Sequence, residues 1–141
     1  MIVLTTPNFV LRQIASPIAT FDESLKSLVS DMFETMTRER GIGLAAPQVG
    51  ISLKVIVTSI DSHCLINPRI IESSNEMCNF LEGCLSIPGK KVNVRRPESI
   101  HIEYNDLSGV QCAEWLKGLK SRVIQHEIDH LDGILMTDRM K

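Results

Sequence analysis

Two histidines near the C-terminal end of the chain constrain its fold more than any other feature. They are His126 and His130, in the segment Gln-His-Glu-Ile-Asp-His-Leu. Residues four apart lie on one face of a helix, so both imidazoles can bind the same metal ion. Glu127 then lies beside that ion, where it can act as a base toward a metal-bound water. Two core histidines on a helix without a metal are the alternative interpretation.

A catalytic metal site of this type needs a third protein ligand, and the sequence after the motif offers few candidates. In one extended form of the motif a third histidine follows, but Met136 occupies that position here. Asp132 lies on another side of a continuing helix, and Asp138 lies in a short tail that folds back with difficulty. We therefore expect the third ligand upstream of the motif.

Upstream, one cysteine stands out among the side chains that could complete the site. Cys84 follows Gly83, and glycine lets the backbone approach a ligand closely. A thiolate beside a divalent ion ionises readily, because the metal favours the charged form. On these grounds Cys84 leads the candidates, but the choice stays open. The others are His63, His101, Cys64, Cys78, Cys112 and several carboxylates.

Three segments resemble the signature motifs of the peptide deformylase family, and they occur in the family's order. Residues 41–48, Gly-Ile-Gly-Leu-Ala-Ala-Pro-Gln, match GxGLAAxQ. Residues 82–86 match EGCLS, and residues 125–131 match QHExDHL. The resemblance extends from about Leu11 to Met140. It implies removal of the formyl group from the N-formylmethionine of new polypeptides, with release of formate.

The resemblance assigns the metal site and the base. Cys84, His126 and His130 would bind one divalent ion, and a water molecule would take the fourth position. Family members commonly use iron, so we expect Fe²⁺; zinc, nickel and cobalt also suit these ligands. Glu127 would be the general base toward this metal-activated water, and then the acid that protonates the departing amine.

The resemblance also assigns the residues that stabilise the oxyanion and bind the substrate. The side-chain amide of Gln48 and the backbone N–H of Leu85 would stabilise the oxyanion. Backbone groups of Ile42, Gly43 and Gly83 would pair with an extended N-formylmethionyl peptide, as an added strand does. An apolar pocket would take the methionine side chain, and its walls would be Ile42, Phe80, Leu119 and Val123.

Structural roles compete with some of these assignments. Residues 43–46 could form a tight packing corner after a helix. Gln48 could cap a backbone group, because a buried glutamine needs hydrogen-bond partners. Glu82 is expected to be structural, in an ion pair with Arg95 or Arg96.

Hydrophobic periodicity predicts two helices. Residues 22–40 carry apolar side chains at helical spacing, with a capping box of Thr20 and Glu23 before them and Gly41 as the stop. Residues 117–131 form the second helix, which carries the histidine motif and ends before Gly133.

Strand patterns complete the predicted fold. Single strands are expected at residues 53–59 and 65–71, the latter interrupted by Pro68, and a hairpin at residues 99–105 and 110–115. The fold class is therefore α+β. Antiparallel strands pack around a central HExxH helix, with an N-terminal helix, in a single domain that lacks an extended C-terminal tail.

Composition excludes several other classes of protein. A chain of 141 residues fits one catalytic domain, residues 1–141. The net charge is −2, no basic run suggests nucleic-acid binding, and no apolar stretch approaches the length of about 18 residues that spans a membrane. The N-terminus lacks a signal-peptide pattern, and four cysteines without CxxC spacing indicate reduced thiols. We expect a cytoplasmic monomer of bacterial, bacterial-host or organellar origin.

Two other functions fit parts of the sequence. A general metallopeptidase would cleave internal peptide bonds, but it would usually take its third ligand from downstream of the motif. A peptide- or ribosome-binding module with a structural metal would need a fourth protein ligand, and it would leave Glu127 and Gln48 without a purpose. Relatives usually continue with a further tail that has been linked to ribosome docking, so ribosome association is not predicted here.

Overall fold

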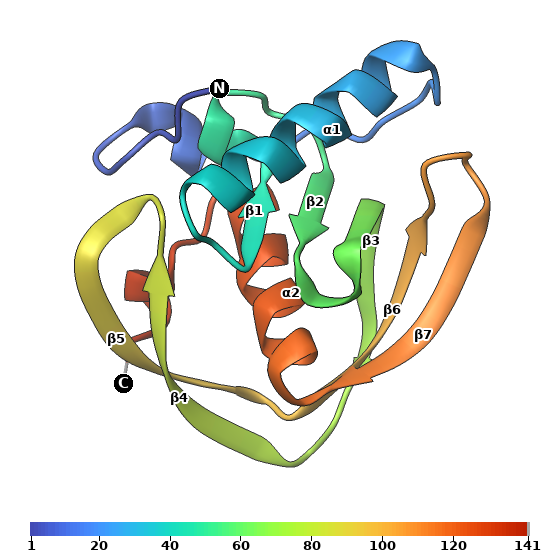
Figure 1. Ribbon diagram of the computed structural model, residues 1–141. Helices are drawn as coiled ribbons and strands as arrows, with labels where there is room; N and C mark the ends of the chain where they lie inside the picture. Colours follow the sequence, from blue (N-terminus) through green and yellow to red (C-terminus); the bar gives the residue numbers. More distant parts are fainter. Residues whose placement is uncertain (141) are drawn as a thin grey trace.

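The computed structural model describes residues 1–140, in which strands outnumber helices (Figure 1). The strands are β1 (Gly43–Ala45), β2 (Val55–Thr58), β3 (His63–Ser73), β4 (Met77–Cys84), β5 (Ile87–Pro97), β6 (Ser99–Asn105) and β7 (Gln111–Lys117). The α-helices are α1 (Glu23–Arg38) and α2 (Gly118–Leu131). Short 3-10 helices are η1 (Phe9–Arg12), η2 (Ala46–Val49), η3 (Ile60–Ser62) and η4 (Met136–Arg139).

The strands form an antiparallel sheet in the order β1-β2-β3-β6-β7 and a separate hairpin of β4 and β5. The predicted hairpin is confirmed: β6 pairs with β7 from Ser99 opposite Lys117 to Asn105 opposite Gln111. β3 connects the two halves of the sheet, because its first residues pair with β2 and its later residues with β6.

The two helices cover opposite faces of the sheet. Side chains alternate between the faces of a strand, so neighbouring residues of β2 enter different cores. Val55 and Val57 pack with the apolar side of α1, whereas Ile56 packs with Ile124 and Ile128 of α2. Because both faces are covered, β2 is fully buried, and its residues Val55–Val57 are all apolar.

Helix α2 lies at the centre of the molecule, between the sheet and the β4–β5 hairpin (Figure 1). Every residue from Ser121 to Leu131 is buried, including the polar ones. The expected α+β architecture around a central HExxH helix is therefore confirmed. A third apolar cluster packs the N-terminal segment and the residues after α2 against β5, through Leu11, Ile87, Val92, Val94, Leu135 and Met136.

Several expected details of α1 are wrong. Its N-cap is Asp22, whose carboxylate accepts a hydrogen bond from the Leu25 N–H at 3.1 Å, so Thr20 and Glu23 form no capping box. Asp is as good a cap as Ser and better than Thr, and it stands one residue before the helix begins. At the other end Arg40, not Gly41, adopts the left-handed conformation, with φ of 60°.

The strand predictions also need correction. β3 continues through Pro68, because register irregularities between Ile66 and Arg69 accommodate a residue that has no N–H to donate. The residue before it, Asn67, has a left-handed φ of 52° and binds the backbone N–H and C=O of Ile18 through its side chain. The hairpin of β4 and β5 was not predicted, although it supplies one wall of the site.

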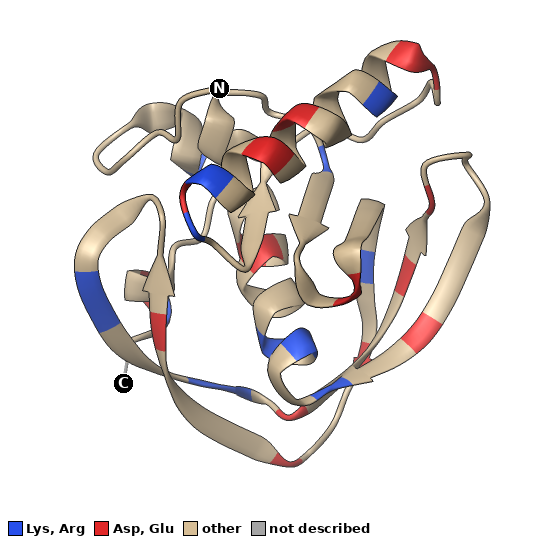
Figure 2. Cartoon of the chain, viewed as in Figure 1, with Lys and Arg blue, Asp and Glu red and all other residues tan. Residues whose placement is uncertain are grey.

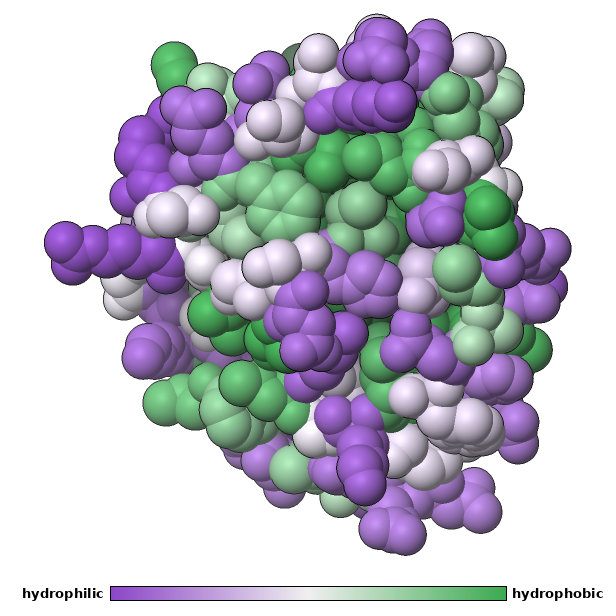
Figure 3. Space-filling model, turned by 45° about the vertical axis from the view of Figure 1, so that its right-hand side comes forward, coloured by the Kyte–Doolittle hydropathy of each residue, from purple (hydrophilic) through white to green (hydrophobic). Residues whose placement is uncertain are grey.

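The surface is mixed in polarity. On the face drawn in Figure 3, an apolar area is surrounded by polar and charged side chains. Among residues 1–140, no helix combines the length and apolar character needed to cross a bilayer.

Candidate active site

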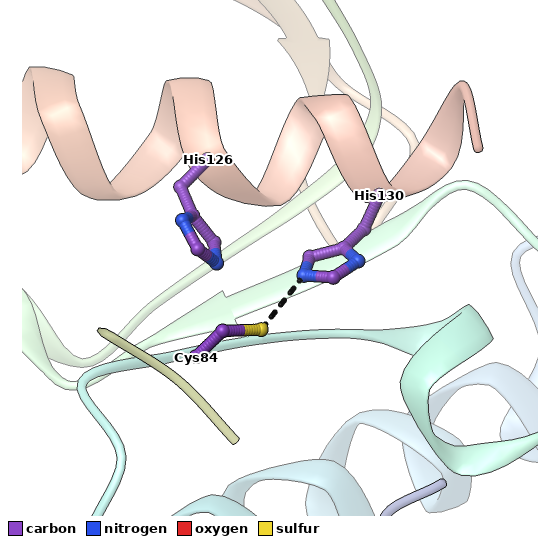
Figure 4. Close-up of side chains that lie close together, drawn as sticks. All are labelled: Cys84, His126 and His130. Carbon is purple, nitrogen blue, oxygen red and sulfur yellow. Dashed lines mark hydrogen bonds between the residues drawn. The ribbon is translucent and has the colours of Figure 1, made fainter. Parts of the chain in front are cut away.

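Cys84, His126 and His130 converge between the β4–β5 hairpin and α2 (Figure 4). Both histidines project from one side of the helix toward the cysteine, which ends β4. Their ligand atoms all lie within 4.8 Å of one another, and the Cys84 Sγ lies 3.3 Å from the His130 Nε2. The structure thus brings Cys84, which lies upstream of the motif, together with both histidines.

These three donors fit a transition-metal ion. Bonds of about 2.0–2.3 Å in a tetrahedral site place the ligand atoms roughly 3.5 Å apart. The 3.3 Å between Cys84 and His130 is close to that value, and all the ligand atoms lie within 4.8 Å of one another. The set offers two imidazoles and one thiol and no fourth protein donor within the group. A site of three protein ligands keeps one position open, as catalytic centres require.

The orientation of His126 is fixed by Glu82. The Nδ1 of His126 lies 2.9 Å from the Glu82 carboxylate, which leaves Nε2 as the nitrogen for a metal. Burial opposes the ionisation of Glu82, but hydrogen bonds from His126 and Arg96 lower its pKa to about 2. Burial likewise disfavours protonated His126, yet hydrogen bonds to Cys84 and Glu82 outweigh it and raise the pKa to about 10. A bound metal competes with a proton for Nε2, so its affinity depends on pH.

A buried ion network extends from Glu82 across α2. Arg96 donates to both oxygens of Glu82, at 2.6 and 3.0 Å, and to Asp129 at 2.8 Å. Arg122 also donates to Glu82 at 2.5 Å, and Arg139 forms a bidentate pair with Asp129. The expected pair of Glu82 with Arg96 is confirmed. Arg122, Asp129 and Arg139 were missed, because sequence spacing does not show which buried positions face one another.

Glu127 lies beside the donors, against the backbone of β1. A Cβ on Gly43 would lie 2.6 Å from Glu127 Oε2, so the carboxylate occupies space that only glycine leaves free. Its other oxygen, Oε1, is buried and has no hydrogen-bond partner among residues 1–140. Burial raises the pKa of Glu127 to about 7, and the charges of His126 and Arg96 counteract only part of that effect. A carboxyl group in this range can both accept and donate a proton near neutral pH.

The side chain of Gln48 points its amide nitrogen toward the site. Its Oε1 accepts a hydrogen bond from the Ala45 N–H at 2.9 Å, which identifies the opposite atom as the donor. That Nε2 lies 3.2 Å from the Ser86 Oγ and 3.8 Å from the Cys84 Sγ. The expected capping role and a donor at the site therefore coexist, one on each end of the amide.

A cavity of about 820 Å³ opens at these residues. The six residues that were assigned to substrate binding all line it, namely Ile42, Gly43, Phe80, Gly83, Leu119 and Val123. Gln48, Cys84, Leu85, His126 and Glu127 also line it. The carbonyl of Ile42 already accepts from Ser59 and Thr58, so its N–H and side chain are the groups left to contact a ligand.

Further cavity-lining residues were not anticipated from the sequence. Arg122 lies with its guanidinium 5.4 Å from the centre of the Phe80 ring, and it also binds the Cys78 carbonyl at 2.6 Å. It thus ties the β4 wall of the cavity to α2. The positively charged rim was missed as well, and it includes Arg40, Lys90 and Lys91.

The remaining candidate ligands lie outside the donor group. His63 contacts the Tyr104 hydroxyl at 3.0 Å, and His101 stacks on Trp115 with ring centres 5.1 Å apart. Cys112 is half-buried against the core, as expected for a cysteine in a strand.

Comparison with known proteins identifies relatives along the whole chain. The family model described as polypeptide deformylase matches residues 1–141. A peptide deformylase of Picosynechococcus sp. is 46% identical over 139 residues, covering 94% of this chain and 74% of that protein.

Solved structures agree with that result. A peptide deformylase of Plasmodium falciparum in complex with an inhibitor has a TM-score of 0.96 and 42% identity, covering 99% of this chain and 88% of that one. The peptide deformylase of Thermotoga maritima has a TM-score of 0.96 and 41% identity, covering 99% and 96%. These similarities extend over the two helices, the sheet and the hairpin together.

Proposed function

The chain belongs to the peptide deformylase family, whose members remove the formyl group from the N-terminal methionine of nascent chains, and we propose which of its residues carry out each step of that reaction. Cys84, His126 and His130 hold one divalent metal ion, and Glu127 moves the protons. The observation that carries the proposal is the convergence of three donor atoms within 4.8 Å, at a cavity that Glu127 and Gln48 also line.

The family is metal-dependent, and we propose Fe²⁺ as the ion, as the sequence resemblance implies. Zinc, nickel and cobalt suit the same nitrogen and sulfur donors. When bound, such an ion acts as a Lewis acid and lowers the pKa of a coordinated water molecule to about 7. Glu82 supports the site by holding the Nδ1 proton of His126, which keeps Nε2 available.

Glu127 transfers the protons of the hydrolysis. Its carboxylate takes a proton from water as the formyl carbon is attacked, and it returns that proton to the nitrogen of the departing amine. The C–N bond breaks, and formate and a free methionine N-terminus result. Burial against Gly43 and Val123 keeps Glu127 away from bulk solvent, where its basicity would be weaker. A positioned base contributes about 10²–10⁴-fold to the rate.

Gln48 and Leu85 stabilise the oxyanion of the formyl group. The Gln48 Nε2 is directed to the site because Ala45 holds the other end of the amide. The backbone N–H of Leu85 follows the cysteine directly, in the tight turn between β4 and β5. One such donor contributes about 10²–10³-fold.

The substrate binds as an additional strand with its methionine side chain in the apolar part of the cavity. Among residues 1–140, β4 pairs only with β5, which leaves its other edge near Gly83 for an N-formylmethionyl peptide. Ile42, Phe80, Leu119 and Val123 line the cavity and provide an aliphatic and aromatic surface suited to a thioether.

We also propose that residues 1–141 act as one catalytic domain, in the compartment where formylated chains are made. The family match across residues 1–141 supports the first point. The second follows from the substrate, because formylated N-termini arise on ribosomes of the bacterial cytoplasm and of organelles.

Formate release from a formyl-Met peptide by the iron-loaded protein tests the proposed activity. Release of formate with appearance of a free amine is expected. A folded, metal-loaded protein that releases none would refute the assignment. A longer formylated peptide serves as the control. Cleavage of one of its internal peptide bonds would favour a general peptidase.

Two variants test the roles of individual residues. Glu127→Ala should abolish turnover while metal content stays near one ion per chain, because the carboxylate is not a ligand. Cys84→Ala should lose the metal, since two imidazoles alone bind it weakly. Full metal occupancy in Cys84→Ala, measured by elemental analysis, would show that the ligand assignment is wrong.

A further inference from the structure

Three cationic side chains stand on the rim of the substrate cavity and have no ionic partner among residues 1–140. They are Arg40, after α1, and Lys90 and Lys91, on β5 (Figure 2). All three are exposed, and none forms an ion pair or a side-chain hydrogen bond in that part of the chain. The one acidic residue beside them, Glu39, is paired with Arg38 at 3.3 Å.

The other charges at the cavity do not offset this rim. Arg122 and Glu82 also line it, but they are buried and bind each other. Glu127 lies at the bottom, next to the metal donors. The mouth of the cavity is therefore positive, whereas the chain as a whole has a net charge of −2. Cations at a concave opening attract anionic groups more strongly than isolated surface charges do.

Lys91 lies opposite Gly83, beside the path of the proposed peptide. The two residues are partners in the hairpin register. A Cβ on Gly83 would lie 3.9 Å from both Cγ and Cε of Lys91, so the lysine side chain leans across β4 over the glycine. Among residues 1–140, the opposite edge of β4 is unpaired, and β4 residues line the cavity.

Arg40 occupies a backbone position that ordinarily takes glycine or asparagine. Its φ of 60° is left-handed, directly after the end of α1 and before Gly41. Such a conformation is unfavourable for a residue that carries a side chain. Strained non-glycine residues of this kind concentrate at functional sites, and here the strained residue brings a cation to the cavity mouth.

From these observations we propose that the rim formed by Arg40, Lys90 and Lys91 is a specificity site for acidic side chains in the residues that follow the formylmethionine. The inference rests on the proposed function and adds a preference beyond the first residue. A formylated N-terminus has no charge of its own, so recognition by this rim must come from downstream side chains. The contacts are exposed, which limits the preference to about 3- to 10-fold.

The test measures kcat/KM for formyl-Met-Ala-Xaa-Ala peptides with amidated ends. Xaa is Glu, Gln or Lys, because Glu and Gln have the same shape and differ in charge. The same substitutions at the second and fourth residues locate the contact along the peptide. We expect the order Glu, Gln, Lys at one or more of these positions, with the ratio of Glu to Gln about 3 to 10 at low salt. The ratio should approach one above about 0.5 M salt, because exposed charges are screened.

Variants separate the three cations from general effects. Lys90→Gln, Lys91→Gln and Arg40→Gly should each reduce the Glu preference, and the triple variant should abolish it while the Gln peptide keeps its kcat. Arg40→Gly relieves the left-handed strain, so a lower preference cannot arise from an unfolding protein. Lys26→Gln is the matched control, because it removes the same charge from the first turn of α1, away from the cavity.

Two results would overturn the specificity site. One is equal kcat/KM for the Glu and Gln peptides at low salt, and the other is an unchanged preference in the triple variant. Failure of the proposed function is a different outcome, because then no peptide of the series, the Gln peptide included, would release formate.

Discussion

The absence of a side chain at Gly43 leaves the space that the proposed base, Glu127, occupies. A Cβ there would lie 2.6 Å from Glu127 Oε2 and 2.8 Å from a methyl carbon of Val123. Real Cβ atoms do not approach oxygen or carbon so closely. The glycine of the first motif is thus required by the glutamate of the third motif, which lies more than 80 residues later. The glycine of the first motif and the glutamate of the third motif are therefore linked by a steric requirement.

Gly43→Ala should therefore lower kcat without removing the metal. The methyl group must displace the Glu127 carboxylate, and a misplaced base forfeits much of its contribution of about 10²–10⁴-fold. We expect a loss of at least about 10²-fold in kcat with metal content unchanged in elemental analysis. Wild-type kcat in this variant would show that the carboxylate can move without consequence.

At the scale of the element, the start of α1 distinguishes two possible caps. Asp22 accepts the Leu25 N–H, whereas Thr20 takes no part. Asp22→Ala should lower the free energy of unfolding by about 1 kcal/mol, because the amide loses its acceptor. Thr20→Ala is the paired control and should change it by less than about 0.5 kcal/mol. Urea denaturation of both variants gives the comparison, and a larger loss in Thr20→Ala would contradict the observed cap.

The ion network that joins β4, β5 and α2 should matter far more than a surface pair. Arg96 is buried and binds both Glu82 and Asp129, so its removal leaves two carboxylates with fewer partners in a dry environment. Arg96→Met should lower the free energy of unfolding by about 3–5 kcal/mol.

Arg12→Met provides the exposed counterpart of that substitution. Its pair with Asp138 has side chains that are 51% and 40% exposed, so about 1 kcal/mol or less is expected. Equal losses in the two variants, measured by urea unfolding, would show that the Arg96 network does not hold the hairpin to the helix.

Elements with regular hydrophobic patterns could be predicted from the sequence, and the irregular ones could not. The alternation of Ile100 and Ile102 predicted β6, and the motif helix was placed within one residue. β4 and β5 were missed because most of their residues are exposed, and β4 exposes apolar side chains such as Phe80 and Leu81, so β4 shows no regular alternation of apolar and polar residues. The alternation of Val92 and Val94, both buried in the third cluster, was the available signal.

The residues of the site also include some that could be predicted from the sequence and some that could not. The two histidines follow from helical spacing, but the residues alone left Cys84 as one of several ligands, and the family resemblance selected it. Contacts that depend on how the hairpin folds over α2 had no local signature. The bonds from Arg122 and His126 to Glu82 are examples, since they join positions about 40 residues apart.

At the scale of the whole molecule, the proposed metal links the β4–β5 hairpin to α2, although β6 and β7 separate these elements in the sequence. Cys84 belongs to the hairpin, and His126 and His130 belong to α2. Removal of the metal with a chelator should lower Tm and speed hydrogen exchange in β4 and β5, because binding energy is also folding energy.

Hydrogen exchange with and without the chelator measures this difference. The β6–β7 hairpin is the internal control, since it contributes no ligand and should change little. Adding Zn²⁺ should restore protection. Equal changes in both hairpins would contradict a local link and indicate a global loss of stability.

The central place of α2 has a consequence for how the protein is made. The helix that fills the middle of the molecule follows all seven described strands in the chain. On a ribosome, the sheet is therefore synthesised before the helix that covers Ile56, Leu65 and Ile102 on its inner face. Until residues 118–131 emerge, α2 cannot cover that apolar face. The exposed face makes the growing chain prone to aggregation. An enzyme that acts on other proteins at the start of their synthesis thus completes the apolar cluster on this face, and gains both histidines of its site, only after its seven described strands have been made.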